Sequence, residues 1–409
     1  MNTPKIRFKG YTDAWEQRKL GDFGEATGGT SIESEFSEDG IYKVINIGSY
    51  SEDSTYRDQG IRAIDSEKTK NRVLNAGDLT MILNDKTASG NIIGRALLIE
   101  ESGVYVYNQR TERIEIYKDK YDAAYIYEML NAPEIRDKII KQSQGNTQIY
   151  VNWSAISQTE YLVPKFEEQC RIGEFLQKLG TLITLHQRKC DSLNAVKKYM
   201  LQKMFPKQGE SVPEIRFKGF TGAWEQRKIG DIARNTYGGG TPKTSVEEYW
   251  NGNIPWIQSS NLKENELFSV DIQKRITETG LHKSATQLVP GNSIAVVSHV
   301  GVGKLVFMPM EYTTSQDFIS LSDLKTEPKF TCYALHRRLQ QDLHIVQGSA
   351  IKGITKDDLL IKEINVPRFE EQEKIGSYFY SLDNLIALHQ RKCDNLKELK
   401  KFMLQNMFP

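Results

Sequence analysis

The sequence predicts an α/β protein in which two similar α/β domains are joined by two long antiparallel coiled-coil helices, with pseudo-two-fold symmetry between the halves. Two segments that each occur twice in the chain, which we call frames, support this prediction. IRFKGYTDAWEQRKLGD (6–22) recurs as IRFKGFTGAWEQRKIGD (215–231) with 14 of 17 positions identical, and residues 163–206 recur as 366–409 with 27 of 44 identical. The segments between the frames barely resemble each other, so we infer that one scaffold carries two different domains.

The two inserted segments contain short β-type runs bounded by turn residues, which is typical of α/β domains. The runs lie at 42–47, 79–83, 96–99 and 113–117, and at 254–257, 293–298, 304–307 and 318–321, with helical stretches at 121–130 and 332–341. VLNAGDLTMILND (73–85) parallels QLVPGNSIAVVSH (287–299), and KVINIGSY (43–50) parallels PWIQSSNL (255–262). We therefore expect the two domains to share a fold and to differ in loop chemistry.

The long repeat has the seven-residue periodicity of a coiled coil. In the first copy the apolar stripe comprises Ile172, Leu176, Leu179, Ile183, His186, Cys190, Leu193, Met200 and Met204, with one gap at Lys197. Met-Phe-Pro ends each copy, because proline cannot continue a helix. A helix of this length spans roughly 58 Å at about 1.5 Å per residue, too long for one small domain. Two such helices are expected to pack antiparallel.

These observations predict five segments. They are a first recognition domain with its N-terminal frame at 1–165, a first helical spacer at 166–206, a linker at 207–213, a second recognition domain at 214–368 and a second helical spacer at 369–409.

Composition predicts an ordinary globular chain located in the cytoplasm. Hydrophobic residues make up 39% and charged residues 26% of the 409 residues. The first residues lack the apolar run of a signal peptide, and no stretch approaches the roughly 18 apolar residues of a membrane span. Four cysteines without a CxxC pair argue against a disulfide framework. The net charge of +1 neither favours nor excludes nucleic acid, since DNA binding needs only a local basic surface.

At the level of motifs the chain resembles a specificity subunit of a type I restriction–modification system. GGGTPKTSVEEYWNGNIPW (238–256) is similar to a loop of the recognition domains in that family, and VP-x-FEEQ-x-x-IG with LHQRKCD is similar to its helical region. The first domain departs from the pattern, because SIESEFSEDG follows Gly28–Thr30 in place of the TP…YW stretch.

The resemblance implies a non-catalytic subunit that binds double-stranded DNA, with each domain reading one half of a bipartite asymmetric target. The helices would set the gap and dock two methyltransferase (modification) subunits, and ATP-dependent restriction subunits would join them. No cofactor is expected on this chain, since S-adenosylmethionine, ATP and Mg would belong to the partners. The alternative is a self-contained DNA methyltransferase or nuclease, for which we find no catalytic motif. A pure scaffold without DNA is a third possibility, but it would gain nothing from two unlike domains.

Base readers are expected among polar loop residues, whose side chains can pair with base edges. In the first domain the candidates are Asn46, Ser49, Tyr50, Asn84, Lys86, Thr87, Asn108, Gln109, Arg110, Asn146 and Gln148. In the second domain they are Thr241, Lys243, Gln258, Ser259, Ser260, Asn261, Ser298, His299, Ser315, Gln316 and Lys352. Half or more of them are expected to contact phosphates or to serve only loop structure.

Three further patterns favour structural roles. SHVGVGKL (298–305) lacks the first Gly and the final Ser/Thr of a phosphate loop, so we predict a β-turn. His186, Cys190, His389 and Cys393 could form a zinc set, but all four lie on the apolar stripe, and we predict no metal. Trp15, Trp224, Phe166 and Phe369 are predicted to be packing anchors, with partner docking as the alternative.

Overall fold

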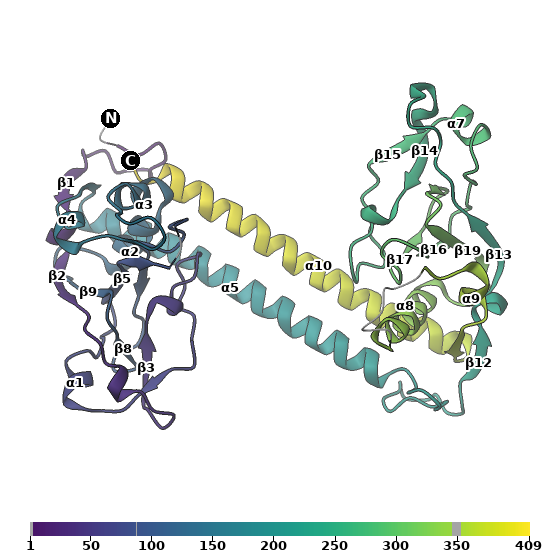
Figure 1. Cartoon of the computed structure of the whole chain (residues 1–409), viewed down its shortest axis with the longest axis horizontal. Coiled ribbons are helices and arrows are strands. Elements are labelled where there is room, and N and C mark those ends of the chain that lie inside the picture. Colours follow the sequence, from purple (N-terminus) through teal and green to yellow (C-terminus); the bar gives the residue numbers. More distant parts are fainter. Residues whose placement is uncertain (1–2, 87, 346–352) are drawn as a thin grey trace. The chain divides into compact units, whose positions relative to one another are not determined.

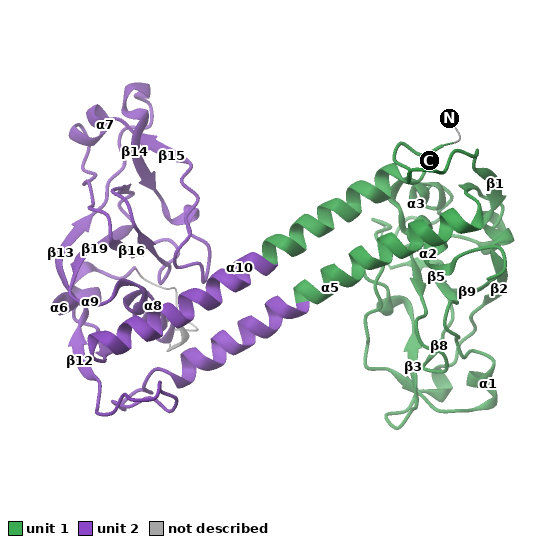
Figure 2. Cartoon of the chain, turned by 180° about the vertical axis from the view of Figure 1, so that it is seen from behind, with its two compact units in different colours: residues 1–187, 390–409 green, residues 188–389 purple. Residues whose placement is uncertain are grey.

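Two units make up the chain in the computed structural model, which describes residues 3–86, 88–345 and 353–409. Unit 1 consists of Met1–Gln187 and Gln390–Pro409, and unit 2 consists of Arg188–His389 (Figure 2). Within the described ranges, no helix is long and apolar enough to cross a membrane.

Unit 1 is built from short strands and helices followed by one long helix (Figure 1). Its strands are β1 (Glu16–Lys19), β2 (Gly24–Gly28), β3 (Tyr42–Ile45), β4 (Arg62–Ala63), β5 (Leu79–Ile82), β6 (Asn84–Asp85), β7 (Ala96–Leu98), β8 (Tyr105–Tyr107), β9 (Thr111–Ile116), β10 (Ile149–Tyr150) and β11 (Glu160–Val163). Its helices are α1 (Glu67–Lys70), α2 (Ala123–Asn131), α3 (Pro133–Ile140), α4 (Trp153–Ile156) and the first part of α5 (Phe166–Lys203).

Unit 2 repeats most of this order. Its strands are β12 (Glu225–Lys228), β13 (Ala233–Gly238), β14 (Trp250–Ile257), β15 (Lys274–Ile276), β16 (Ser293–Val297), β17 (Leu305–Met308), β18 (Thr313–Thr314), β19 (Phe318–Leu324) and β20 (Glu363–Val366). Its helices are α6 (Ile229–Ile232), α7 (Glu278–His282), α8 (Pro328–Ile345), α9 (Lys356–Leu360) and the first part of α10 (Phe369–Asn406).

The two units share one sheet topology. A four-stranded antiparallel sheet has the order β2-β9-β5-β7 in unit 1 and β13-β19-β16-β17 in unit 2. A three-stranded sheet has the order β4-β3-β8 or β15-β14-β18, and each contains one parallel pair. A two-stranded pair, β1-β11 or β12-β20, lies directly before the long helix. The prediction of two similar α/β domains is confirmed, and every predicted strand overlaps an observed one.

An ion pair fastens each N-terminal frame to the start of the following long helix. Arg7 donates two hydrogen bonds of 2.7 Å to the Glu168 carboxylate, whose side chain is 1% exposed. In unit 2, Arg216 does the same to the fully buried Glu371, at 2.6 and 2.7 Å. The duplicated basic residues at these two positions are therefore not solvated surface charge, because each is held by a carboxylate.

Each core is completed by the end of the long helix from the other sequence repeat. Met407 and Phe408, which follow α10, belong to the core of unit 1, where Phe408 lies 5.6 Å from Tyr125 between ring centroids. Met204 and Phe205, which follow α5, belong to the core of unit 2, and Phe205 stacks on Phe330 at 5.6 Å. Within each unit a segment of α5 thus lies beside a segment of α10 in the opposite direction (Figure 2). This confirms the predicted antiparallel helices.

Five of the nine residues of the predicted apolar stripe in the first copy are buried, and Ile183, His186, Leu193 and Met200 are partly exposed. Ile172, Leu176, Leu179 and Cys190 are at most 6% exposed, and their counterparts Ile375, Phe379, Leu382 and Cys393 are at most 8% exposed. The gap at Lys197 is filled by an ion pair with Asp383, a residue of α10 in the same unit. Its counterpart Lys400 pairs instead with the buried Glu128 of α2, at 2.7 Å.

Candidate nucleic-acid interface

Three backbone segments of unit 1 meet at the strand ends that carry most of its predicted base readers. The N–H of Asn108 donates to the carbonyl of Ile45 at 3.0 Å, which places the end of β8 beside Asn46. The N–H of Leu83 donates to Arg110 at 3.0 Å, and Val151 donates to Leu83 at 2.9 Å. Pairing of β6 with β10 adds Gln148 to this surface, because Ile149 lies opposite Asp85.

Unit 2 repeats this arrangement with different side chains. Ser315 donates its N–H to the carbonyl of Ile257 at 2.9 Å, as Asn108 does to Ile45. Ser298 donates to Asp317, and Ile354 donates to Ser298, both at 2.7 Å. The correspondence predicted between KVINIGSY and PWIQSSNL is therefore present as equivalent backbone contacts.

A glycine at the start of each candidate loop allows the backbone to pass against these segments. A Cβ atom on Gly29 would lie 2.0 Å from the carbonyl oxygen of Asn108, and one on Gly239 would lie 1.8 Å from that of Ser315. Any side chain would force the loops apart. In unit 2 the indole N–H groups of Trp250 and Trp256 donate to the carbonyls of Lys243 and Gly240, and so fix the loop that begins there.

About half of the predicted readers present side chains to solvent. Those exposed in unit 1 are Lys86, Gln109, Arg110, Asn146 and Gln148, and those in unit 2 are Thr241, Lys243, Ser260, His299 and Gln316. Thr241 and Gln316 contact each other at 2.7 Å, and Gln109 donates to Glu33 at 3.2 Å. Arg110 has a φ of 67°, a left-handed conformation that turns the chain sharply before β9. Asn46, Asn84, Gln258 and Ser259 are partly exposed.

Six predicted readers have buried side chains: Ser49, Tyr50, Asn108, Asn261, Ser298 and Ser315. Several are engaged in holding loops. The side-chain oxygen of Asn108 accepts from the N–H of Ile32 at 3.1 Å, and that of Asn261 accepts from Gln258 at 2.8 Å. The hydroxyl of Ser298 donates to the carbonyl of Asp317 at 2.8 Å. The structure therefore gives these groups contacts within the protein. Thr87 and Lys352 lie outside the described residues.

Sequence reasoning missed Glu112, a carboxylate that is 6% exposed beside the same loops. It lies on β9 opposite Gly28, and a Cβ on Gly28 would be 3.3 Å from its Oε2 atom. Burial raises the pKa of Glu112 to about 7, against a smaller opposing effect of the Arg72 charge. Arg72 itself donates to the carbonyl of Gly28 and to the hydroxyl of Thr30, at 2.7 and 2.9 Å. The sequence did hold a sign of this buried carboxylate, because Glu112 alternates with Ile114 and Ile116 on the inward side of the strand TERIEI.

We expect Glu112→Gln to stabilise unit 1 at pH 8 and to have little effect at pH 5. Burial favours the protonated carboxyl, so its contribution to wild-type stability is complete below the ordinary pKa of 4.5 and is lost as pH rises through about 7. The difference in unfolding free energy should approach about 3 kcal/mol at pH 8. Denaturant unfolding at both pH values measures it. Glu115→Gln, at an exposed position of the same strand, is the control, and equal effects at both pH values would contradict the prediction.

The remaining sequence predictions concern turns, metals and aromatic anchors. Residues 298–304 form the turn of the β16–β17 hairpin, as predicted for the segment that resembles a phosphate loop. Within the part of the chain that is described, no three metal-ligating side chains form a cluster. Cys190 and Cys393 are buried, with sulfurs 3.7 and 3.8 Å from the carbonyls of Ile386 and Ile183.

The two tryptophans of the frames are core residues, as predicted. Trp15 and Trp224 are each 3% exposed and pack on Tyr125 and Phe330, at 6.3 and 5.8 Å between ring centroids. The packing prediction is wrong for Phe166 and Phe369, which are 40% and 50% exposed as the first residues of their helices. Partner docking stays a prediction for these two.

Comparison with known proteins matches most of the chain to one family. The family described as "Type I restriction modification DNA specificity domain" matches residues 12–195 and 222–398. The type I restriction enzyme MjaIX specificity subunit of Methanocaldococcus jannaschii is 28% identical over 189 residues, which cover 45% of this chain and 44% of that relative. The EcoR124I/EcoR124II specificity subunit of Escherichia coli is 29% identical over 176 residues, which cover 40% and 42%. The chain thus spans less than half the length of these two relatives.

Similarity of fold extends over the whole chain. The crystal structure of a type I restriction–modification S subunit from M. genitalium has a TM-score of 0.62 and 14% sequence identity, and the match covers 100% of this chain and 99% of that one. At this identity the comparison establishes the arrangement of elements alone.

Proposed function

Because the chain belongs to the family of type I restriction modification DNA specificity proteins, we propose that it is the specificity subunit of such a complex. Each unit reads one half of a bipartite asymmetric sequence in double-stranded DNA, and the helices set the gap. Two methyltransferase subunits dock on the helices, and restriction subunits join them. The family match favours this function over the alternative of a self-contained methyltransferase or nuclease.

One observation carries the proposal. The same backbone hydrogen bonds and the same glycine contact present different polar side chains in the two units. Lys86, Arg110 and Gln148 occupy this surface in unit 1, whereas Thr241, His299 and Gln316 occupy it in unit 2. Bases are distinguished by the pattern of donors and acceptors that faces them. Two unlike surfaces on one scaffold therefore suit two unlike half-sites.

Exchange of one domain tests whether each unit reads its own half-site. Residues 28–162 would be replaced by the equivalent segment of a relative, and adenine methylation would be mapped genome-wide in a host that also makes the modification subunit. We expect one half of the methylated sequence to change, while the other half and the gap stay the same. A change in both halves would contradict independent reading by the units.

The docking proposal is supported by exposed apolar side chains on the helices of each unit, which we call the apolar patch of that unit. In unit 1 it comprises Leu182 and Leu185 of α5 with Leu399 and Phe402 of α10, which are 38–59% exposed. In unit 2 the equivalent residues are Leu385 and Leu388 of α10 with Val196 and Tyr199 of α5, which are 44–53% exposed. Exposed apolar clusters of this kind mark protein interfaces. Since both patches use equivalent positions, they suit two copies of one partner.

We expect native mass spectrometry of the co-expressed complex to show two modification subunits per chain. Replacing Leu185 and Phe402 with glutamate should reduce this to one, because charges would be buried in one interface. Replacing Leu388 and Tyr199 is the matched variant for the other patch and should also leave one. A two-to-one complex in all variants would show that docking uses another surface.

The chain alone is proposed to lack catalysis, with S-adenosylmethionine, ATP and Mg bound by its partners. Methyl transfer to DNA by the purified chain with added S-adenosylmethionine would contradict this.

A further inference from the structure

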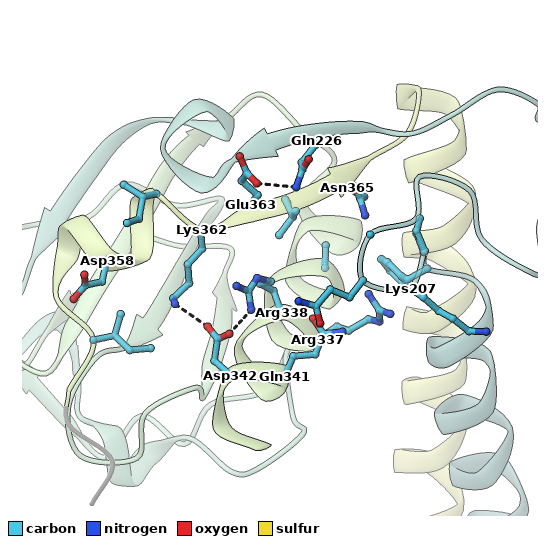
Figure 3. A pocket seen from close by; sticks show the side chains of 18 of the residues that line it. Lys207, Gln226, Arg337, Arg338, Gln341, Asp342, Asp358, Lys362, Glu363 and Asn365 are labelled. Atoms are coloured by element: carbon cyan, nitrogen blue, oxygen red, sulfur yellow. Dashed lines mark hydrogen bonds and ion pairs between the residues drawn. The ribbon is translucent and has the colours of Figure 1, made fainter. Parts of the chain in front are cut away.

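A basic groove lies in unit 2 between α8, the last turns of α5 and the linker after α5. It consists of two adjoining cavities of about 810 and 650 Å³, and Lys207, Arg337 and Gln341 line both of them. Figure 3 shows the smaller cavity, in which Arg338 and Lys362 point to Asp342 from two sides. The larger cavity, lined by Lys197, Lys198, Lys203, Lys207, His336 and Arg337 among others, has no carboxylate among its described lining residues.

The larger cavity retains a surplus of positive charge. Lys197 pairs with Asp383, and both Lys203 and Lys207 pair with Glu214. Five lysine and arginine side chains thus face two partner carboxylates, which leaves an excess of three positive charges. Of the described residues, none forms an ion pair with Lys198 or Arg337.

Arg337 is held in place by an aromatic ring, and no acidic residue in the described part of the chain pairs with it. Its guanidinium lies 5.7 Å from the centroid of the Phe205 ring, a core residue that cannot move freely. Burial lowers the pKa of Arg337, and no carboxylate opposes that effect. A partly buried cation that is fixed by an aromatic ring and lacks an anion is poised to bind one.

Part of the surplus comes from residues outside the duplicated frame, above all from Arg337 of the second domain. The Phe330 ring packs on Trp224 as the Tyr125 ring packs on Trp15. Phe330 and Tyr125 are therefore equivalent, and the residues that follow them can be matched between the units. Seven residues after Phe330 unit 2 has Arg337, whereas seven residues after Tyr125 unit 1 has Ala132. Of the helix lysines, Lys197 and Lys198 recur as Lys400 and Lys401, whereas Asn406 stands at the position of Lys203.

The groove adjoins a loop that carries predicted base readers. Asn265 lines it and lies four residues beyond Asn261. The side-chain oxygen of Asn265 contacts His336 Nε2 at 3.1 Å, which ties α8 to that loop. Lys198 and Gln202 line the groove one helical turn apart, on a different flank of α5 from Val196 and Tyr199 of the apolar patch.

We propose that the larger cavity of this groove binds the phosphodiester backbone of DNA without regard to base sequence, next to the half-site read by unit 2. The inference rests on the proposed function. A protein partner would need an exposed apolar anchor at the centre of its site. Tyr333, the aromatic residue of the larger cavity, is instead buried and donates to Asp383. The larger cavity offers cations and amide donors, with no carboxylate among its described lining residues, and so matches a phosphate chain, whose affinity comes from charge. The smaller cavity is nearly balanced in charge, because Asp342, Asp358 and Glu363 also line it.

The test is a salt titration of binding by the full chain to duplexes of random sequence. Arg337→Gln combined with Lys198→Gln should lower the slope of log affinity against log salt by about 2, since each lost phosphate contact removes about 0.9. Lys401→Gln, the matched change in unit 1, should leave the slope nearly unchanged. Lys198→Glu alters only an exposed side chain, so it tests the groove without risk to folding, and it should also lower the slope.

The outcomes separate this inference from the proposed function. An unchanged slope in both groove variants overturns the inference, and so does loss of modification-subunit binding with normal DNA binding. Failure of the wild-type complex to methylate a defined sequence would instead overturn the proposed function. The groove variants should methylate the same sequence as the wild type, because their effect is independent of bases.

Discussion

Phe408→Ala, a change at the next-to-last residue of the chain, is expected to destabilise the N-terminal unit and to spare the second. Phe408 is 4% exposed and packs on Tyr125 in the core of unit 1. Removing a buried phenylalanine costs about 3–5 kcal/mol, from lost burial and from the cavity that remains.

Hydrogen exchange resolved by peptide distinguishes the units. In Phe408→Ala, exchange should increase in α2 and β9, while β16 and β19 keep the wild-type rate. Phe205→Ala is the matched variant and should give the reverse, because Phe205 belongs to the core of unit 2. Phe402→Ala, at a position 51% exposed, is the control. Equal loss of protection in both units would show that the contacts do not act within one unit.

Loss of Arg216, the arginine that pairs with a buried carboxylate in the second unit, is expected to have an effect of similar size. In Arg216→Met, the carboxylate of Glu371 is left fully buried without its cation. Breaking a buried pair by removing one partner costs about 3–5 kcal/mol. Arg216 also donates to the carbonyl of Gly222 at 2.6 Å, so a second acceptor loses its donor. Denaturant unfolding, monitored by hydrogen exchange in β12 and β20, measures the lost free energy of unfolding.

A second substitution separates charge burial from packing. Arg216→Met combined with Glu371→Leu should recover most of the stability, because two apolar side chains often replace a buried ion pair without loss. Lys218→Met changes an exposed cation of the same frame and should alter stability by less than about 0.5 kcal/mol. If the double variant is no more stable than Arg216→Met, the cost lies in packing and not in the unpaired carboxylate.

The elements that follow a period or a repeat could be predicted from the sequence. The heptads identified the buried side of each long helix, since residues seven apart lie on one helix face. Trp15 and Trp224 were predicted as anchors from their identical positions in the frames. The ion pair of Arg7 with Glu168 could not be predicted, because its members are 161 positions apart and no pattern relates them.

Loop residues were harder to assign, because a polar side chain in a loop can face solvent or satisfy the backbone. Asn108 and Gln109 are adjacent, yet the first is buried with its oxygen bound to Ile32 and the second is exposed. Glu112 was missed for the opposite reason, since a charged residue in a strand is ordinarily expected to face water. Arg337 was missed because its partner ring comes from a different sequence repeat.

During translation the two units become complete at different times. Unit 2 is one continuous segment, so all of its core has left the ribosome once His389 has emerged. Unit 1 begins first, but it also needs Gln390–Pro409, which is made only after unit 2. The 202 intervening residues take roughly 10–40 s at about 5–20 residues per second. During that interval the nascent first domain exposes the apolar site that Met407 and Phe408 later fill. A polypeptide whose synthesis stops just after His389 therefore contains a complete second unit and an incomplete first one.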